Sequence, residues 1–149
     1  MEPASDPFDL KRFVDAQRPV YRSVVNELSG GRKHGHWMWF IFPQLRGLGR
    51  TALAEQFGIS GLEEAAAYLA HDVLGPRLHE CAQLVVAIPG RTISDIMGTP
   101  DDMKLGSSMT LFARATDDNE DFVAVLTKYY GGGEDPLTVA RLNRRRGLT

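Results

Sequence analysis

The chain has 149 residues, of which 43% are hydrophobic and 24% charged, and its formal net charge is −2. This composition is typical of one globular domain that can bury a core without disulfides or metals, and the single cysteine, Cys81, excludes an intramolecular disulfide. The slightly acidic balance argues against nucleic-acid binding, and the sequence contains neither a signal peptide nor a membrane-spanning run. We therefore expect a soluble, cytoplasmic protein whose partners include no nucleic acid and no membrane.

The first third of the chain has helical periodicity. Asp6 is a candidate N-cap, and a second helix that begins at Pro19 should end at Gly30 and Gly31. The aromatic run at 37–42 resembles a strand in composition. Because no second strand pattern exists to pair with it, we expect a short buried helix that ends before the following proline.

The remaining helices are predicted from apolar spacing and from capping residues. Ser60 with Glu63 forms a capping box, and Asp72 can cap the long helix that follows. Pro100 and Asp101 suit a turn or a first helical turn, and Gly106 and Ser107 then lead into another helix. The other expected helices lie at 51–58, 92–97, 119–130 and from Asp135-Pro136 onward.

These patterns predict an all-α fold. We expect a compact single domain of seven to nine short helices over residues 1–149, with no repeat and no linker. The basic tail at 144–149 should fray into solvent from the end of the last helix.

The loop at 42–49 is the first candidate binding segment. Gln44 carries both donor and acceptor groups, Arg46 carries a fork suited to carboxylate or phosphate, and the glycines at 47 and 49 permit close backbone approach. Either Trp37 or Trp39 could form one wall of a pocket, although most of the aromatic run should be core. A plain flexible turn is the alternative for the loop.

The segment DDMKLGSSMT, at 101–110, is the second candidate. Asp102 and Lys104 would lie in the turn, and Ser108 at the helix start, where free N–H groups favour anions. The structural alternative is that Ser107 caps the helix and that Asp102 pairs with Lys104.

The sequence indicates no catalytic set, cofactor or metal site. His34 and His36 are two residues apart, which is not the spacing of metal ligands on a helix, and no cysteine or acidic partner lies nearby in the sequence. Cys81 falls on an apolar helix face, so we expect an inert buried thiol.

Four motifs carry a family resemblance: HWMWFIFPQLRGLG, GLEEAAAYL, LGPRLHEC and PDDMKLGSSMTLFARA. Together they resemble a bacterial domain-of-unknown-function family, sometimes labelled "calpastatin", over about residues 6–132, and they are similar to a mycobacterial conserved hypothetical protein. The resemblance implies a compact helical domain and no particular activity. Calpastatins are long, repeated and disordered, and this chain is not.

Two functions remain open at this point. The first is a small-molecule-binding helical domain for a polar or anionic ligand, held between the two candidate segments by Trp37, Gln44, Arg46, Asp102, Lys104 and Ser108. The second is a protein–protein interaction module, as monomer or homodimer, without catalysis. The first requires these polar groups to converge on a cavity, and the second requires an exposed apolar patch.

Overall fold

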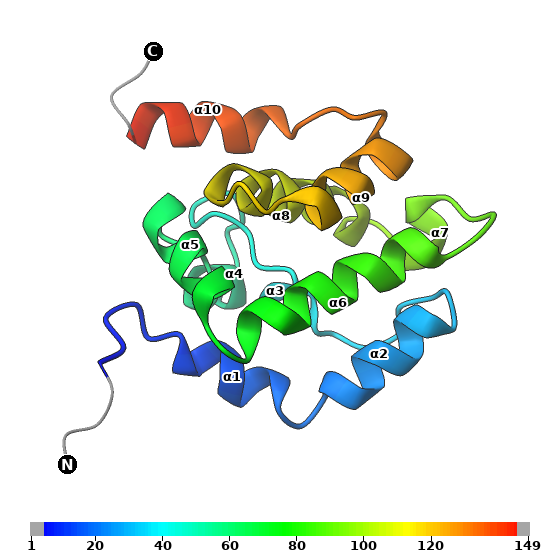
Figure 1. Cartoon of the computed structure of the whole chain (residues 1–149), viewed down its shortest axis with the longest axis horizontal. Helices are drawn as coiled ribbons and strands as arrows, with labels where there is room; N and C mark the ends of the chain where they lie inside the picture. The colour runs from blue at the N-terminus through cyan, green and yellow to red at the C-terminus, as the bar shows by residue number, and fades with distance from the viewer. Residues whose placement is uncertain (1–4, 146–149) are drawn as a thin grey trace.

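The computed structural model describes residues 5–145, which form ten α-helices and no strand (Figure 1). Seven of these helices have seven residues or more, and the all-α prediction is confirmed. The helices are α1 (Lys11–Gln17), α2 (Tyr21–Ser29), α3 (Met38–Ile41), α4 (Ala52–Gln56), α5 (Leu62–Ala70), α6 (Leu74–Ala87), α7 (Ile93–Met97), α8 (Asp101–Ala115), α9 (Glu120–Tyr130) and α10 (Pro136–Arg145).

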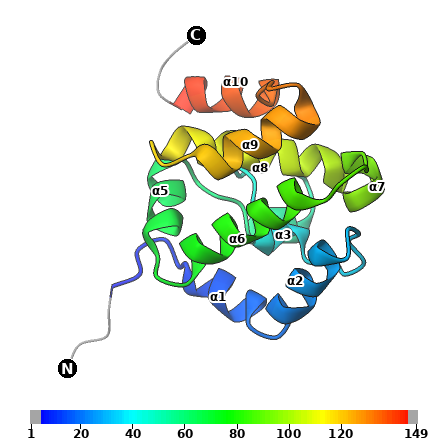
Figure 2. The same cartoon turned by 45° about the vertical axis from the view of Figure 1, so that its right-hand side comes forward.

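The helices stack around α8. In Figures 1 and 2, α10 lies at one edge, α8 and α9 lie beside it, α6 crosses the middle, and α1 and α2 form the opposite edge. Helix α8 packs against α5, α7, α9 and α10. One cluster of buried apolar residues joins all these layers, so the described residues share one hydrophobic core.

Helical spacing identifies the buried face of the long helices. The apolar positions expected to face inward on α6 and just after it are all buried: Leu74, Leu78, Cys81, Val85 and Ile88. Helix α2 buries Val24 and Leu28 in the same way. The aromatic run contains the short helix α3, which ends before Pro43 as predicted.

The prediction for the start of α8 is wrong. The helix begins at Asp101 and runs straight through Gly106, so Ser107 and Ser108 lie in mid-helix without free backbone N–H groups. Packing explains the difference, because a Cβ on Gly106 would lie only 3.0 Å from the Tyr130 ring. The glycine permits close approach of α9 and is not a helix breaker here.

Three capping predictions also change. The Nδ1 atom of His71, and not Asp72, accepts from the backbone N–H groups of Val73 and Leu74 at the start of α6. Before α5, Ser60 donates its backbone N–H to Glu64 at 2.8 Å, where the sequence suggested Glu63. Asp6 does accept helix-start N–H groups, those of residues 10 and 11, but α1 begins only at residue 11.

The last helix begins as predicted. The Asp135 carboxylate accepts from the backbone N–H of Thr138 at 3.0 Å and from its hydroxyl at 2.6 Å. The predicted tail begins inside this helix, which extends to Arg145, and residues 146–149 lie outside the described part of the chain. None of the helices between residues 5 and 145 combines the length and hydropathy that a membrane span needs.

A close contact at the corner between α5 and α6 provides a test of this packing. A Cβ on Gly75 would lie 2.1 Å from the backbone carbonyl oxygen of Leu69, which cannot move independently of the helix. We expect Gly75→Ala to lower the free energy of unfolding by about 1–3 kcal/mol, because the overpacking outweighs the gain in helix propensity. Urea denaturation measures this change.

Gly61→Ala is the matched control for Gly75→Ala. The position has extended backbone and no atom within 4 Å of an added Cβ, so its stability should change by less than about 0.5 kcal/mol. Equal stabilities of the two variants would contradict the proposed packing of the corner.

Candidate functional site

Glu27 on α2 holds the loop that leads into α3. Its carboxylate accepts from the backbone N–H groups of His34 (2.6 Å) and Gly35 (2.8 Å) and from the indole N–H of Trp37 (3.1 Å). Partial burial raises the pKa of this carboxyl group, but the three hydrogen bonds outweigh it, so the pKa of Glu27 is lowered from 4.5. The charged form of Glu27 therefore fixes the entry to the aromatic run.

Trp37 and Trp39 have opposite environments, although only one residue separates them. Trp37 is 2% exposed, and Glu27 satisfies its N–H group. Trp39 is partly exposed, but its Nε1 atom is buried and has no hydrogen-bond partner. A buried donor without a partner costs about 1–3 kcal/mol, and such groups are few in folded proteins.

Charged side chains surround the two indoles. Lys33 Nζ lies 2.8 Å from Asp101 Oδ2 and 5.0 Å from the Trp37 ring centroid. Lys104 Nζ lies 5.1 Å from the Trp39 ring centroid but 3.8 Å from Asp101 Oδ1, which is too long for a hydrogen bond. The Lys104 ammonium therefore keeps hydrogens available for another acceptor.

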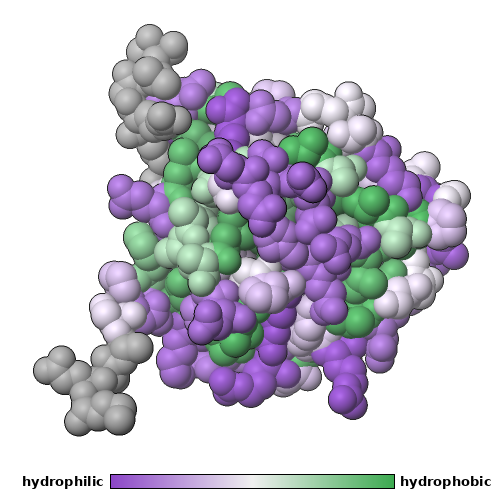
Figure 3. Space-filling model, in the orientation of Figure 1, coloured by the Kyte–Doolittle hydropathy of each residue, from purple (hydrophilic) through white to green (hydrophobic). Residues whose placement is uncertain are grey.

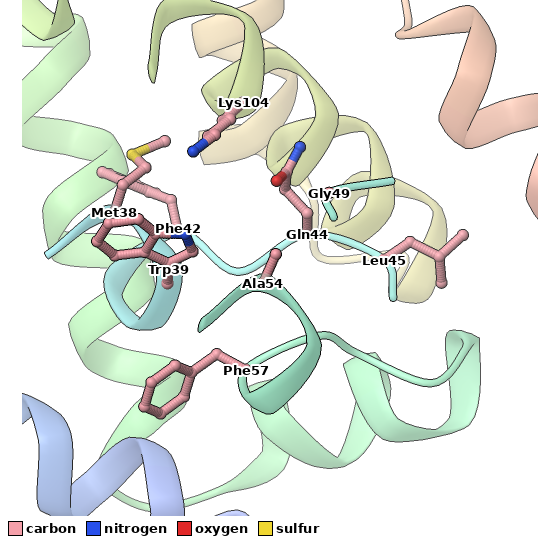
Figure 4. A pocket seen from close by; sticks show the side chains of 9 residues that line it. All are labelled: Met38, Trp39, Phe42, Gln44, Leu45, Gly49, Ala54, Phe57 and Lys104. Carbon is pink, nitrogen blue, oxygen red and sulfur yellow. The ribbon is translucent and has the colours of Figure 1, made fainter. Parts of the chain in front are cut away.

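A small hollow lies beside Trp39, between α3, α4 and α8 (Figure 4). We call it the Trp39 hollow. In Figure 4 the Lys104 side chain points from α8 toward Trp39, and the Gln44 side chain points up from the following loop toward α8. The Gln44 amide group has no hydrogen-bond partner within residues 5–145. The nine lining residues are Met38, Trp39, Phe42, Gln44, Leu45, Gly49, Ala54, Phe57 and Lys104.

Backbone pairing holds the segment that carries Gln44. Its carbonyl accepts from Ile59 N–H at 2.9 Å, and the N–H of Arg46 donates to the Ile59 carbonyl at 2.7 Å. These bonds flank the parallel bridge between Leu45 and Ile59. The arrangement fixes the backbone on one side of the hollow while leaving the Gln44 side chain unengaged.

Two of the six predicted ligand-binding residues, Gln44 and Lys104, line the Trp39 hollow. Trp37 does not line it, because its indole turns toward Glu27. The Arg46 guanidinium donates to the Gly58 carbonyl at 3.0 Å, and Arg46 is not among the residues that line the hollow. The structure therefore does not bring Arg46 and Lys104 into one hollow.

Asp102 and Ser108 do not line the Trp39 hollow either. Asp102 accepts from the hydroxyls of Ser94 (2.7 Å) and Thr99 (3.3 Å), which ties α7 to the start of α8. Ser108 is fully buried, and its hydroxyl has no hydrogen-bond partner in the described structure. The anion site expected at a helix start near Ser108 is not formed, because that helix starts two turns earlier.

The sequence left open which of Trp37 and Trp39 forms the pocket wall, and it did not select Asp101. One turn of helix places residues three apart on the same face, so Met38 and Ile41 turn inward and Trp39 turns toward α8. That spacing could have selected Trp39 over Trp37. Asp101 carried no signal, because its contact with Lys33 joins positions 68 apart in the chain.

The other nucleophilic and metal-binding candidates do not form a second site. Cys81 is 1% exposed, so its expected burial is confirmed, and this burial raises the pKa of the thiol to about 12, which disfavours the reactive thiolate. His34 and His36 are exposed. In the part of the chain that the structure describes, no three His, Cys, Asp or Glu side chains gather closely enough to hold a metal ion.

Comparison with protein families agrees with the motifs. A family model described as "Protein of unknown function (DUF1810)" matches residues 7–142, nearly the whole chain. The chain belongs to the DUF1810 family. Among the curated proteins, none matches the sequence of this DUF1810 protein.

A solved structure shares the fold of this DUF1810 protein. It is the crystal structure of the conserved hypothetical protein Rv1873 from Mycobacterium tuberculosis, with 73% sequence identity and a TM-score of 0.91. The match covers 92% of this chain and 98% of the mycobacterial chain. Neither comparison names a ligand or an activity, so only the side chains of the site indicate what the protein could bind.

The lowered pKa of Glu27 predicts how acid affects this DUF1810 protein. The pKa of Glu27 is lower in the folded protein than the value of 4.5 that it has in the unfolded chain, so the charged carboxylate stabilises the fold at pH values above 4.5. This stabilisation is lost as the pH falls through the lower, folded pKa. Glu27→Gln should therefore lower the urea midpoint at neutral pH and weaken its dependence on pH below about 5. Glu63→Gln, at an exposed position on α5, is the control. An unchanged acid profile for Glu27→Gln would contradict the role of the carboxylate.

Proposed function

We propose that this protein binds a small polar ligand that inserts an anionic or other hydrogen-bond-accepting group into the Trp39 hollow. The observation that supports the proposal is the buried, unpartnered Nε1 donor of Trp39 beside the Lys104 ammonium. Folding leaves this donor unsatisfied, so an acceptor placed there recovers a hydrogen bond that the chain itself does not make.

The donor set favours an acceptor with negative charge. Trp39 can only donate at nitrogen, Lys104 carries three donors and a positive charge, and the Gln44 amide can donate or accept. Asp101 is the nearest acid to Lys104, but its other oxygen is already paired with Lys33 at 2.8 Å. Hydrogen bonds from these donors to an anion would be charge-assisted, and so stronger than those to a neutral acceptor.

The size of the hollow limits what enters it. The space open to a water-sized molecule is about 10 Å³, which is about the size of a single water site. A halide ion or one oxygen of a carboxylate or phosphate matches that space, and the body of a larger ligand would lie outside the rim. The lining also includes Gly49 and Ala54, which offer no polar side-chain group to a ligand.

Anion titrations test the proposal. We expect chloride, acetate or phosphate to raise the melting temperature and to change the fluorescence of Trp39 in a Trp37→Phe background, where Trp39 is the remaining tryptophan. Trp39→Phe removes the N–H group and should weaken binding, measured by calorimetry, about tenfold or more, since a hydrogen bond to a charged group contributes about 1.5–3 kcal/mol. Lys104→Met should weaken binding at least as much.

Lys11→Met is the matched control for Lys104→Met, because Lys11 is 73% exposed and pairs only with Asp15. Equal losses at the two lysines would show a general ionic effect and would overturn the proposal. Binding that survives Trp39→Phe unchanged would also overturn it.

Exposed apolar side chains favour a second function, a protein–protein interaction module. Met103 is 68% exposed, and Leu137 is 70% exposed. Pro136, next to Leu137 in the chain, lines one groove with Met103 and Tyr130. Apolar side chains gathered on one surface are typical of an association site.

The interaction module predicts association through this surface. If it forms a homodimer, sedimentation equilibrium should show a dimer for the natural chain and a monomer for Met103→Lys combined with Leu137→Lys. Lysine at exposed Val123, on α9, is the control. A natural chain that stays monomeric at high concentration would argue against self-association.

A further inference from the structure

A second site lies where the C-terminal ends of α2 and α6 come together. A trough runs between these helices, with room for about 470 Å³, which is within the range of ligand pockets. Its apolar lining includes Leu28, Leu84, Ala87, Ile88 and Pro89. In Figure 3 hydrophobic surface appears on the right-hand side, where Figure 1 places the ends of α6 and α2.

One end of the trough is cationic. Arg91 lines the trough and also lines a neighbouring depression of about 290 Å³, together with Arg32, Ser94 and Asp95. Arg91 thus borders both depressions, of which the first has a largely apolar lining and the second is lined by Arg32 and Arg91. We call the two together the α2–α6 trough.

The backbone of the α2 end positions Arg91. Gly31 has φ +84°, a left-handed conformation that suits glycine, and an added Cβ would meet the Arg91 side chain at 3.6 Å. Arg91 Nη1 donates to the Gly31 carbonyl at 3.3 Å, a long hydrogen bond that occupies one of its five donors. The rest of the guanidinium remains available.

No carboxylate within residues 5–145 forms an ion pair with the two arginines at this end. Within residues 5–145, Arg32 forms no side-chain hydrogen bond or ion pair, and Arg91 forms no ion pair. Asp95 accepts from the Thr92 N–H at 3.2 Å as part of a helix cap. Ser94 donates its hydroxyl to Asp102 at 2.7 Å, so it cannot also donate to an anion. The arginine pair is thus free to bind an external anion.

We propose that the α2–α6 trough binds an amphiphile, a single apolar chain that ends in a phosphate or carboxylate group. Guanidinium forks match these head groups with paired hydrogen bonds, and the apolar floor buries the chain beside them. A free anion would use only the arginine end. The site is separate from the Trp39 hollow, and no lining residue is common to the two.

Calorimetry with decyl phosphate below its critical micelle concentration tests the proposal. We expect one decyl phosphate to bind per chain, and both inorganic phosphate and decanol to bind at least about tenfold more weakly, because each lacks half of the recognised structure. Inorganic phosphate that binds as tightly as decyl phosphate would overturn the role of the apolar floor. Binding only to phosphatidate vesicles, and not to monomeric decyl phosphate, would overturn the single-ligand site.

Variants at exposed positions separate the two ends of the trough. Arg32→Gln and Arg91→Gln should each weaken decyl phosphate binding about tenfold, whereas Arg50→Gln, an exposed arginine elsewhere, should not. Ala87→Gln places a polar side chain in the trough and should weaken decyl phosphate binding without affecting inorganic phosphate. Ala70→Gln, exposed at the end of α5, is its control. Equal losses in a variant and its control would overturn the proposal, and unchanged melting temperatures verify that all variants fold.

Discussion

Helix α8 is buried on every side over eight consecutive residues, from Leu105 to Phe112, and the rest of the fold is arranged to achieve this. A helix enclosed all round cannot use only one apolar stripe, so it needs small residues where neighbours approach and, for most buried polar groups, internal partners. The hydroxyl groups of Ser107 and Thr110 have such partners within the helix, whereas that of Ser108 has none in the described structure. Gly106 provides the close approach to Tyr130, and the Thr110 hydroxyl donates to the carbonyl of Gly106 at 2.8 Å. The helices α5, α7, α9 and α10 supply the covering surface.

The candidate site forms where α8 leaves this enclosure. Asp101 and Lys104, in its first turn, are partly exposed, and they meet the aromatic segment that Glu27 has anchored from the other side. Two cation–indole contacts and one ion pair join the elements there. The same meeting leaves the Trp39 indole nitrogen buried without a partner. The contacts that pack these elements together and the unsatisfied Trp39 N–H group therefore lie in the same region.

The two proposed sites differ in how they are built. The Trp39 hollow is small and polar at its centre, and its donors come from α3, the following loop and α8. The α2–α6 trough is larger, and it depends on helix ends that stop at glycine or before proline and so leave apolar side chains beside arginines. Both proposed sites contain cationic side chains whose charge is not fully neutralised within the described residues.

The sequence by itself determined the helical class and the buried faces of α2 and α6, because a period of 3.6 residues is a local property that repeats along each helix. It also identified the two segments between which the Trp39 hollow lies, with Gln44 and Lys104 among its lining residues. Only the tertiary structure decided that α8 starts at Asp101, because the local sequence of Gly106, Ser107 and Ser108 is typical of a helix boundary. It likewise decided that Glu27 satisfies Trp37 while Trp39 remains unpartnered. A hydrogen bond between residues on different elements depends on where packing places them, and spacing along the chain carries no record of that placement.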